Sequence, residues 1–184
     1  MDASYATGIK RKSITGYVIT CCSGAINWKS KRQSIVAISS TEAEYIALSQ
    51  IVQEIMWLRS LLKEIGFEQK EPTLVMEDNQ ACIHLAKNPV NHGRSKHIDV
   101  KYHFLREALT DGVFKLQYCE TQNMVADTLT KALPQVAFDR HARHMGLHST
   151  LKGKELEISH PMADPPLSER HQDNDACFAS LLDW

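Results

Sequence analysis

The sequence predicts an α/β domain built on a mixed five-stranded sheet flanked by helices. Three observations predict it: consecutive β-type runs near the N-terminus, a long amphipathic helix at residues 41–66, and short apolar strands that then alternate with helices. Antiparallel strands followed by a crossover helix and further strands are typical of a mixed sheet.

The N-terminal strands form a predicted hairpin. Residues 17–22 and 25–29 are rich in β-branched and aromatic side chains around the turn Ser23-Gly24, and residues 34–38 continue as a third strand. The helix that follows carries apolar side chains at steps of three and four, which define one buried face. This stripe consists of Leu48, Ile51, Ile55, Leu58, Leu62 and Ile65, and we expect Trp28 and Trp57 in the core as well.

The remaining elements follow from the same periodicities. Strands are predicted at residues 73–78 and 113–118, and helices at 79–87, 98–109, 123–133 and 138–147. Residues 1–148 therefore form one domain. We expect residues 149–184 to be a mostly disordered tail, because periodicity is lost there and proline, Asp and Asn recur.

The composition is that of a globular protein. Of 184 residues, 43% are hydrophobic and 23% charged. No membrane span or signal peptide is recognisable, so we expect no membrane partner and no secretion. The 5 cysteines are odd in number and unpaired in spacing, which favours reduced thiols in the cytoplasm or nucleus.

Glu44 is the most informative acidic residue. It lies four residues before Leu48, so its carboxylate begins the apolar stripe of the long helix. One interpretation is a first-turn residue that forms a capping box with Thr41. Ser39 and Glu42 form an equally good box one register earlier, which would leave Glu44 free. A carboxylate on a buried face needs a partner.

Three aspartates lie at comparable places. Asp78 closes a strand and precedes a helix, where an N-cap role would explain it. Asp127 falls in the first turns of a predicted helix, where the helix dipole favours an acid, and Asp2 would ordinarily be a frayed terminus. With Glu44 they offer hard oxygen ligands from separate elements, as two Mg²⁺ ions about 4 Å apart require. The four carboxylates suggest a divalent-metal nuclease centre.

Short basic clusters and a histidine series add two further hypotheses. The clusters could neutralise nucleic-acid phosphates, although singly each is more often a solvated surface. A set with helical spacing, His141, His144 and His148, could hold zinc, but no cysteine pair or acid lies nearby, which favours a surface helix. The candidate nucleic-acid-binding residues are Lys12, Lys29, Lys31, Arg32, Arg94, Lys96 and His97.

Several runs of residues occur together in one protein family. They are Asp2-Ala3-Ser4, Lys12-Ser13-Ile14-Thr15-Gly16-Tyr17, Trp28-Lys29-Ser30-Lys31-Arg32-Gln33, Ser40-Thr41-Glu42-Ala43-Glu44-Tyr45, Glu77-Asp78-Asn79-Gln80, Lys96-His97-Ile98-Asp99-Val100-Lys101-Tyr102-His103 and Ala126-Asp127-Thr128-Leu129-Thr130-Lys131. On these runs, residues 2–148 closely resemble the ribonuclease H domain at the carboxyl end of the Pol polyprotein of copia-type long-terminal-repeat retrotransposons. The resemblance implies a ribonuclease H-like fold.

The resemblance also implies an activity, which is endonucleolytic cleavage of RNA in RNA–DNA hybrids during reverse transcription. The family's metal ligands fall on Asp2, Glu44, Asp78 and Asp127, which would hold two Mg²⁺ or Mn²⁺ ions. Asp2 and Asp78 would hold the metals, with Glu44 on the leaving-group side and Asp127 on the side of the nucleophile. Basic loops would grip both backbones. Partners would be the hybrid and the reverse transcriptase and integrase regions of the parent polyprotein.

One departure from the family concerns the first strand. Only Met1 precedes Asp2, whereas family members carry strand residues there, so we expect a truncated first strand and a poorly anchored Asp2. The alternative function is therefore a catalytically inactive retrotransposon remnant that at most binds nucleic acid or protein.

Overall fold

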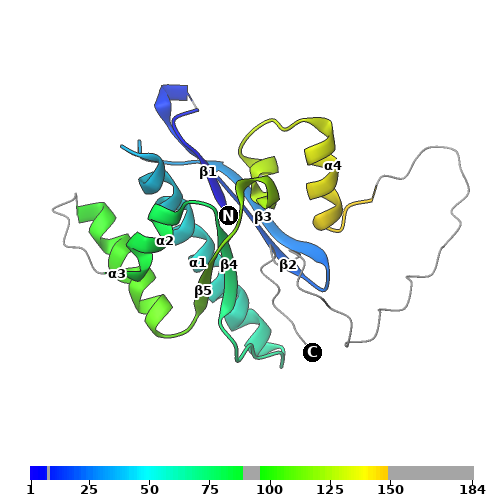
Figure 1. The fold of residues 1–184 in the computed structure, drawn as a ribbon. Coiled ribbons are helices and arrows are strands. Elements are labelled where there is room, and N and C mark those ends of the chain that lie inside the picture. Colours follow the sequence, from blue (N-terminus) through cyan, green and yellow to red (C-terminus); the bar gives the residue numbers. More distant parts are fainter. Residues whose placement is uncertain (8, 89–95, 149–184) are drawn as a thin grey trace, which may run out of the picture.

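The computed structural model describes residues 1–7, 9–88 and 96–148 and has the predicted mixed α/β class (Figure 1). The predicted tail lies outside the described residues. In chain order the elements are β1 (Asp2–Ser4), η1 (Ile9–Arg11), β2 (Ile14–Cys21), β3 (Gly24–Arg32), α1 (Ser40–Glu64), β4 (Thr73–Glu77), α2 (Gln80–Lys87), α3 (Lys96–Thr110), β5 (Phe114–Tyr118), η2 (Thr121–Asn123), η3 (Val125–Leu129) and α4 (Gln135–His144).

The strands form two small sheets where one five-stranded sheet was predicted. β1, β2 and β3 are antiparallel neighbours, and β4 and β5 form a parallel pair. β1 is three residues long and its ladder with β2 starts at the pair Asp2 and Gly16, and among the described residues no ladder joins β1 to β4. The Met1 ammonium donates to the carbonyl oxygen of Met76 at 2.8 Å and joins the two sheets there.

Two other predicted elements are wrong. Residues 34–38 form no strand: the amide of Ile38 donates to the carboxylate of Glu42 at 2.9 Å and belongs to the start of α1. The predicted helix at 123–133 consists instead of the short 3-10 turns η2 and η3. Thr128 Oγ1 donates to the carbonyl oxygen of Val125 at 2.8 Å, and such local hydroxyl bonds compete with α-helix formation.

The core lies between α1 and the strands. The predicted stripe of α1 is buried from Leu48 to Leu58 and packs with side chains from β2, β4 and β5, including Tyr17, Val75 and Phe114. Successive side chains of a strand point to opposite faces. Gly16 of β2 accordingly faces η3, while the Tyr17 hydroxyl interacts with Glu54 of α1. α1 and η3 thus lie on opposite faces of the first sheet.

The two tryptophans expected in the core are exposed. Trp28 is 62% exposed and Trp57 is 57% exposed. Trp28 lies on the same face of β3 as Ser30, whose hydroxyl donates to the carbonyl oxygen of Leu129 of η3 at 2.6 Å. η3 therefore packs on this face of β3, but it does not bury the indole of Trp28. Trp57 is rotated by about 100° from Leu58 around α1, which turns it off the buried stripe.

Gln33, the residue directly after β3, forms side-chain hydrogen bonds with both β2 and α1. Its side chain is 2% exposed, and Nε2 donates to Thr15 Oγ1 at 3.1 Å and to the carbonyl oxygen of Ala43 at 2.9 Å. We expect Gln33→Leu to lower the free energy of unfolding by about 1–3 kcal/mol, because it leaves buried acceptors unpaired. Urea denaturation measures this loss. Gln53→Leu, the same change at an exposed site of α1, is the control, and equal losses would refute the role of Gln33.

Candidate metal centre

The N-terminus of α1 leaves Glu44 free of any capping role. Ser39 is the N-cap and accepts from the Glu42 amide at 3.1 Å, while the Glu42 carboxylate accepts from Ile38. The register predicted from Ser39 and Glu42 is confirmed. Glu44 is 5% exposed, and its Oε2 has no hydrogen-bond partner among the described residues. A buried, unpaired carboxylate oxygen is costly, so it points to a ligand or a proton.

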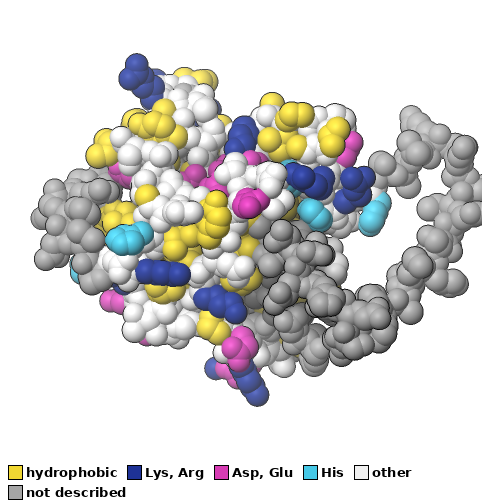
Figure 2. Space-filling model, viewed as in Figure 1, with side chains coloured by type: hydrophobic (Ala, Val, Ile, Leu, Met, Phe, Trp, Pro, Cys, Tyr) yellow, Lys and Arg dark blue, Asp and Glu magenta, His cyan; other side chains and the backbone are white. Residues whose placement is uncertain are grey.

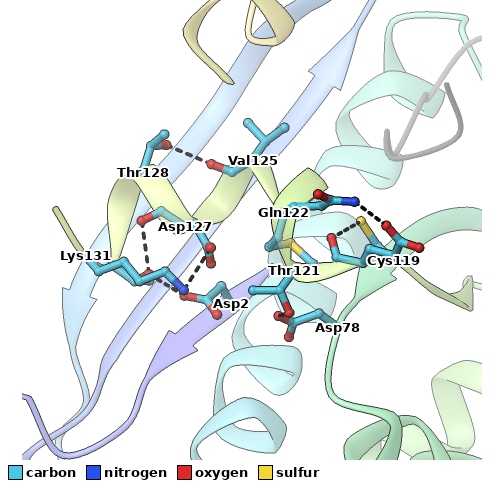
Figure 3. Close-up of polar contacts among 12 residues, drawn as sticks. Asp2, Asp78, Cys119, Thr121, Gln122, Val125, Asp127, Thr128 and Lys131 are labelled. Carbon is cyan, nitrogen blue, oxygen red and sulfur yellow. Dashed lines mark hydrogen bonds and ion pairs between the residues drawn. The ribbon is translucent and has the colours of Figure 1, made fainter. Parts of the chain in front are cut away.

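Asp78 is likewise not the helix cap. Asn79 caps α2, because its side-chain oxygen accepts from the Cys82 amide at 3.0 Å. The N-cap interpretation of Asp78 is therefore wrong. Asp78 Oδ2 instead accepts a hydrogen bond from Thr121 Oγ1 of η2 at 2.7 Å, which orients its carboxylate (Figure 3).

Asp2 is firmly held, contrary to the expectation of a poorly anchored residue. It pairs with Gly16 in the β1–β2 ladder and is 5% exposed. Thr130 Oγ1 donates a hydrogen bond to its Oδ2 (Figure 3). The hydroxyl of Thr130, directly after η3, thus helps to hold the Asp2 carboxylate in place.

Three of the four predicted acids meet in space. One carboxylate oxygen from each of Asp2, Glu44 and Asp78 lies within 4.8 Å of the others. They come from β1, α1 and the end of β4, and carboxylate oxygens are the ligands that Mg²⁺ and Ca²⁺ prefer. Among the side chains that the structure describes, in residues 1–7, 9–88 and 100–148, no second group of three potential ligands is found, and His141, His144 and His148 form none.

Asp127, the fourth predicted acid, lies next to this group but not within it. Its side chain is 5% exposed, and Oδ2 forms an ion pair with Lys131 Nζ at 2.8 Å. Its Oδ1 is buried without a hydrogen-bond partner in the described part of the chain. Figure 3 shows the Lys131 side chain reaching toward Asp127 and Asp2 from one side, with Asp78 on the other side of Asp2.

Burial, together with the charges of neighbouring acids, raises the pKa of several carboxyl groups in the site. Burial, and then the charges of Glu77 and Asp2, raise the pKa of Glu44 to about 10. Burial also raises the pKa of Glu77 to about 8, although the N-terminal ammonium opposes the shift. The pKa of Asp127 rises to about 6, mainly by burial and against the effect of Lys131. At neutral pH the raised pKa values favour the protonated forms of Glu44 and Glu77 in the ion-free site.

Sequence reasoning missed the residues that support the acids. Glu77 is fully buried beside Asp78, and its Oε1 accepts from the Asn79 amide at 3.0 Å. Thr130 and Lys131 lie three and four residues after Asp127, a spacing that could have identified them. No local pattern signals Thr121, since only the packing of η2 brings it to Asp78.

The candidate nucleic-acid-binding residues lie in different settings. Lys12 Nζ donates to the carbonyl oxygen of Ser34 at 2.6 Å, and Lys29 forms an ion pair with Glu54 at 2.9 Å. Lys31 and Arg32 are exposed at the end of β3. Arg94, and the side chains of Lys96 and His97, lie outside the described parts. On the face shown in Figure 2, acidic atoms reach the surface near the middle and Lys and Arg atoms border them.

Gly16 permits the close packing of η3 over β2. A Cβ atom there would lie 2.5 Å from Thr130 Cγ2 and 3.0 Å from the carbonyl oxygen of Ala126. We expect Gly16→Ala to displace η3 and to destabilise the fold by about 1–3 kcal/mol, as overpacking does. Thermal unfolding measures the loss. Gly24→Ala, whose added Cβ would meet no atom closer than 3.8 Å, is the matched control, and a similar loss there would contradict the steric account.

The fold and the site together define a mixed α/β protein with a cluster of three acidic side chains drawn from separate elements. The chain is homologous to one segment of the retrovirus-related Pol polyproteins of copia-type plant transposons. It is 46% identical over 149 residues, 80% of its length, to the Pol polyprotein from transposon TNT 1-94 of Nicotiana tabacum. It is 39% identical over 135 residues, 73% of its length, to that from transposon RE2 of Arabidopsis thaliana.

A more distant relative is the transposon Ty1-JR1 Gag-Pol polyprotein of Saccharomyces cerevisiae, which is 29% identical over 140 residues. The matched segments make up 11%, 9% and 8% of these three relatives, so the chain spans about a tenth of their length. No protein-family model and no solved structure matches the chain. None of the helices in the described residues has the length and apolarity needed to cross a membrane.

Proposed function

We propose that this chain is a ribonuclease H-like domain that hydrolyses the RNA strand of RNA–DNA hybrids with divalent cations. The observation that supports this most strongly is the meeting of Asp2, Glu44 and Asp78 within 4.8 Å, each from a different element. The homology to retrotransposon Pol polyproteins is consistent with a role in reverse transcription, where such hybrids arise.

The residues present fit a divalent cation. Glu44 Oε2 and Asp127 Oδ1 are buried oxygens without hydrogen-bond partners in the described residues, and a cation bound beside each of them would satisfy it. Mg²⁺ or Mn²⁺ bound there would lower the pKa of a water nucleophile and stabilise the oxygen that leaves the phosphodiester. Asp2, Glu44 and Asp78 would hold one ion, and Asp127 with Asp2 would hold a second.

The surrounding residues would position these carboxylates. Thr121 holds Asp78 and Thr130 holds Asp2, so each carboxylate keeps one oxygen bonded to the protein. The exposed cations Lys31 and Arg32 are suited to contact backbone phosphates. Preference for a hybrid would come from contacts to 2′-hydroxyls on one strand only.

The test is cleavage of end-labelled duplexes of one sequence by the purified chain in Mg²⁺ or Mn²⁺. We expect internal cuts in the RNA strand of an RNA–DNA hybrid, none in double-stranded DNA, and none in EDTA. Cleavage of all duplexes alike would refute hybrid specificity. Binding of the hybrid by a folded chain without any cleavage would favour the second candidate, an inactive remnant that binds nucleic acid.

A further inference from the structure

We infer that Lys131 occupies the place of the second divalent cation and must move away before that ion binds. This inference rests on the proposed function. Lys131 Nζ lies 2.8 Å from Asp127 Oδ2, and Figure 3 shows the same side chain reaching toward Asp2. The structure thus pairs the fourth carboxylate with an ammonium, whereas among the described residues no ion pair within 4.0 Å involves Asp2, Glu44 or Asp78.

The local structure explains how the ammonium can be both bound and displaced. The Asp127 side chain is 5% exposed, whereas that of Lys131 is 42% exposed, so the acid is fixed and the base can turn into solvent. Asp127 Oδ1 keeps a free lone pair among the described residues, which a second cation could use together with Oδ2. An ammonium and a divalent cation cannot share one carboxylate oxygen without repulsion.

Thr130 couples this pair to the first site. Its hydroxyl donates to Asp2 Oδ2, and its amide donates to the carbonyl oxygen of Asp127 at 3.1 Å. Lys131 follows directly in the chain, and its amide also donates to that carbonyl oxygen, at 3.0 Å. The end of η3 therefore places an ammonium on Asp127 and a hydroxyl on Asp2, the two carboxylates that would hold the second ion. The first ion should bind without displacing the Lys131 ammonium, whereas the second ion must compete with that ammonium for Asp127.

The experiment counts bound Mn²⁺ by electron paramagnetic resonance for the wild-type chain and Lys131→Met. We expect the wild-type chain to bind one ion tightly and a second weakly. Lys131→Met should bind the second ion about tenfold or more tightly, the effect of removing one competing charge pair. Lys131→Arg, which keeps the charge, and Lys115→Met, at an exposed site on β5, should leave both affinities near the wild-type values.

Thermal unfolding gives a second readout that does not depend on activity. In EDTA, Lys131→Met should melt several degrees below the wild-type chain, because Asp127 stays buried without its cation, and saturating Mn²⁺ should close this gap. A second-site affinity that is unchanged or weaker in Lys131→Met, or a single ion in both proteins, would overturn the inference alone. A wild-type chain that binds no Mn²⁺ would overturn the proposed function as well.

Discussion

Replacing Asp78 by asparagine is expected to abolish hydrolysis of the hybrid and to weaken binding of the first cation. The change keeps the shape of the side chain and its hydrogen bond from Thr121, but it removes one of the three carboxylates that meet. Charge stabilisation by a catalytic metal is worth several kcal/mol, which corresponds to a loss of about a thousandfold or more in rate. The initial rate of RNA-strand cleavage in Mg²⁺ measures it.

The matched control for Asp78→Asn is Asp111→Asn, the same change at an exposed aspartate in the turn after α3. We expect this control to keep full activity, and both variants to keep the circular dichroism spectrum of the wild-type chain. Residual cleavage by Asp78→Asn within tenfold of the wild-type rate would show that Asp78 does not hold a catalytic ion.

Replacing Glu44 by glutamine is expected to stabilise the ion-free chain while destroying the site. Burial, Glu77 and Asp2 raise the pKa of Glu44 from its usual 4.5 to about 10. Below pH 4 the carboxyl is protonated in both the folded and unfolded chain and has no effect. Between its usual and raised pKa it ionises only on unfolding, so each pH unit removes about 1.4 kcal/mol of stability.

Glutamine at position 44 cannot ionise, so this loss disappears. At pH 7.5 in EDTA we expect Glu44→Gln to unfold with a free energy higher than the wild-type chain by on the order of 2–4 kcal/mol, and the gap to vanish near pH 4. Urea denaturation over that pH range measures it. Glu64→Gln, at the exposed end of α1, is the control. A Glu44→Gln variant that is less stable than the wild-type chain at pH 7.5 would contradict the raised pKa.

Mg²⁺ should reverse the order of the two proteins. A bound cation favours the ionised form of Glu44, so the wild-type chain gains stability from Mg²⁺ and gains more as the pH rises. Glu44→Gln lacks this charge and should gain little. Measurements in EDTA give the loss of stability caused by bringing the acids together, and measurements in Mg²⁺ give the stability gained when the cation binds.

The sequence predicted the structure best where a residue pattern is compatible with only one type of secondary structure. The apolar stripe of α1 and the capping register of Ser39 placed Glu44 on the buried face, as the structure has it. β4 and β5 were also found within a residue of their bounds, because short apolar runs between turn residues have few alternatives.

Prediction failed where side-chain hydrogen bonds and packing between distant residues decide the local structure. The β-type residues 34–38 lead into the cap of α1, and the helix predicted at 123–133 breaks into 3-10 turns that pack on Gly16. The same turns carry Thr121, Thr130 and Lys131 to the acids. A spacing rule shows which residues share a face, but not which hydroxyl will meet a carboxylate from an element more than 100 residues away.

The most direct test of the account is to locate Mn²⁺ by anomalous diffraction in crystals of the chain grown with that ion. We predict a peak bounded by the carboxylates of Asp2, Glu44 and Asp78, and its absence in crystals of Asp78→Asn. A well-ordered carboxylate cluster without a peak at saturating Mn²⁺, or a peak at another site only, would contradict the claim that these three acids form a metal centre.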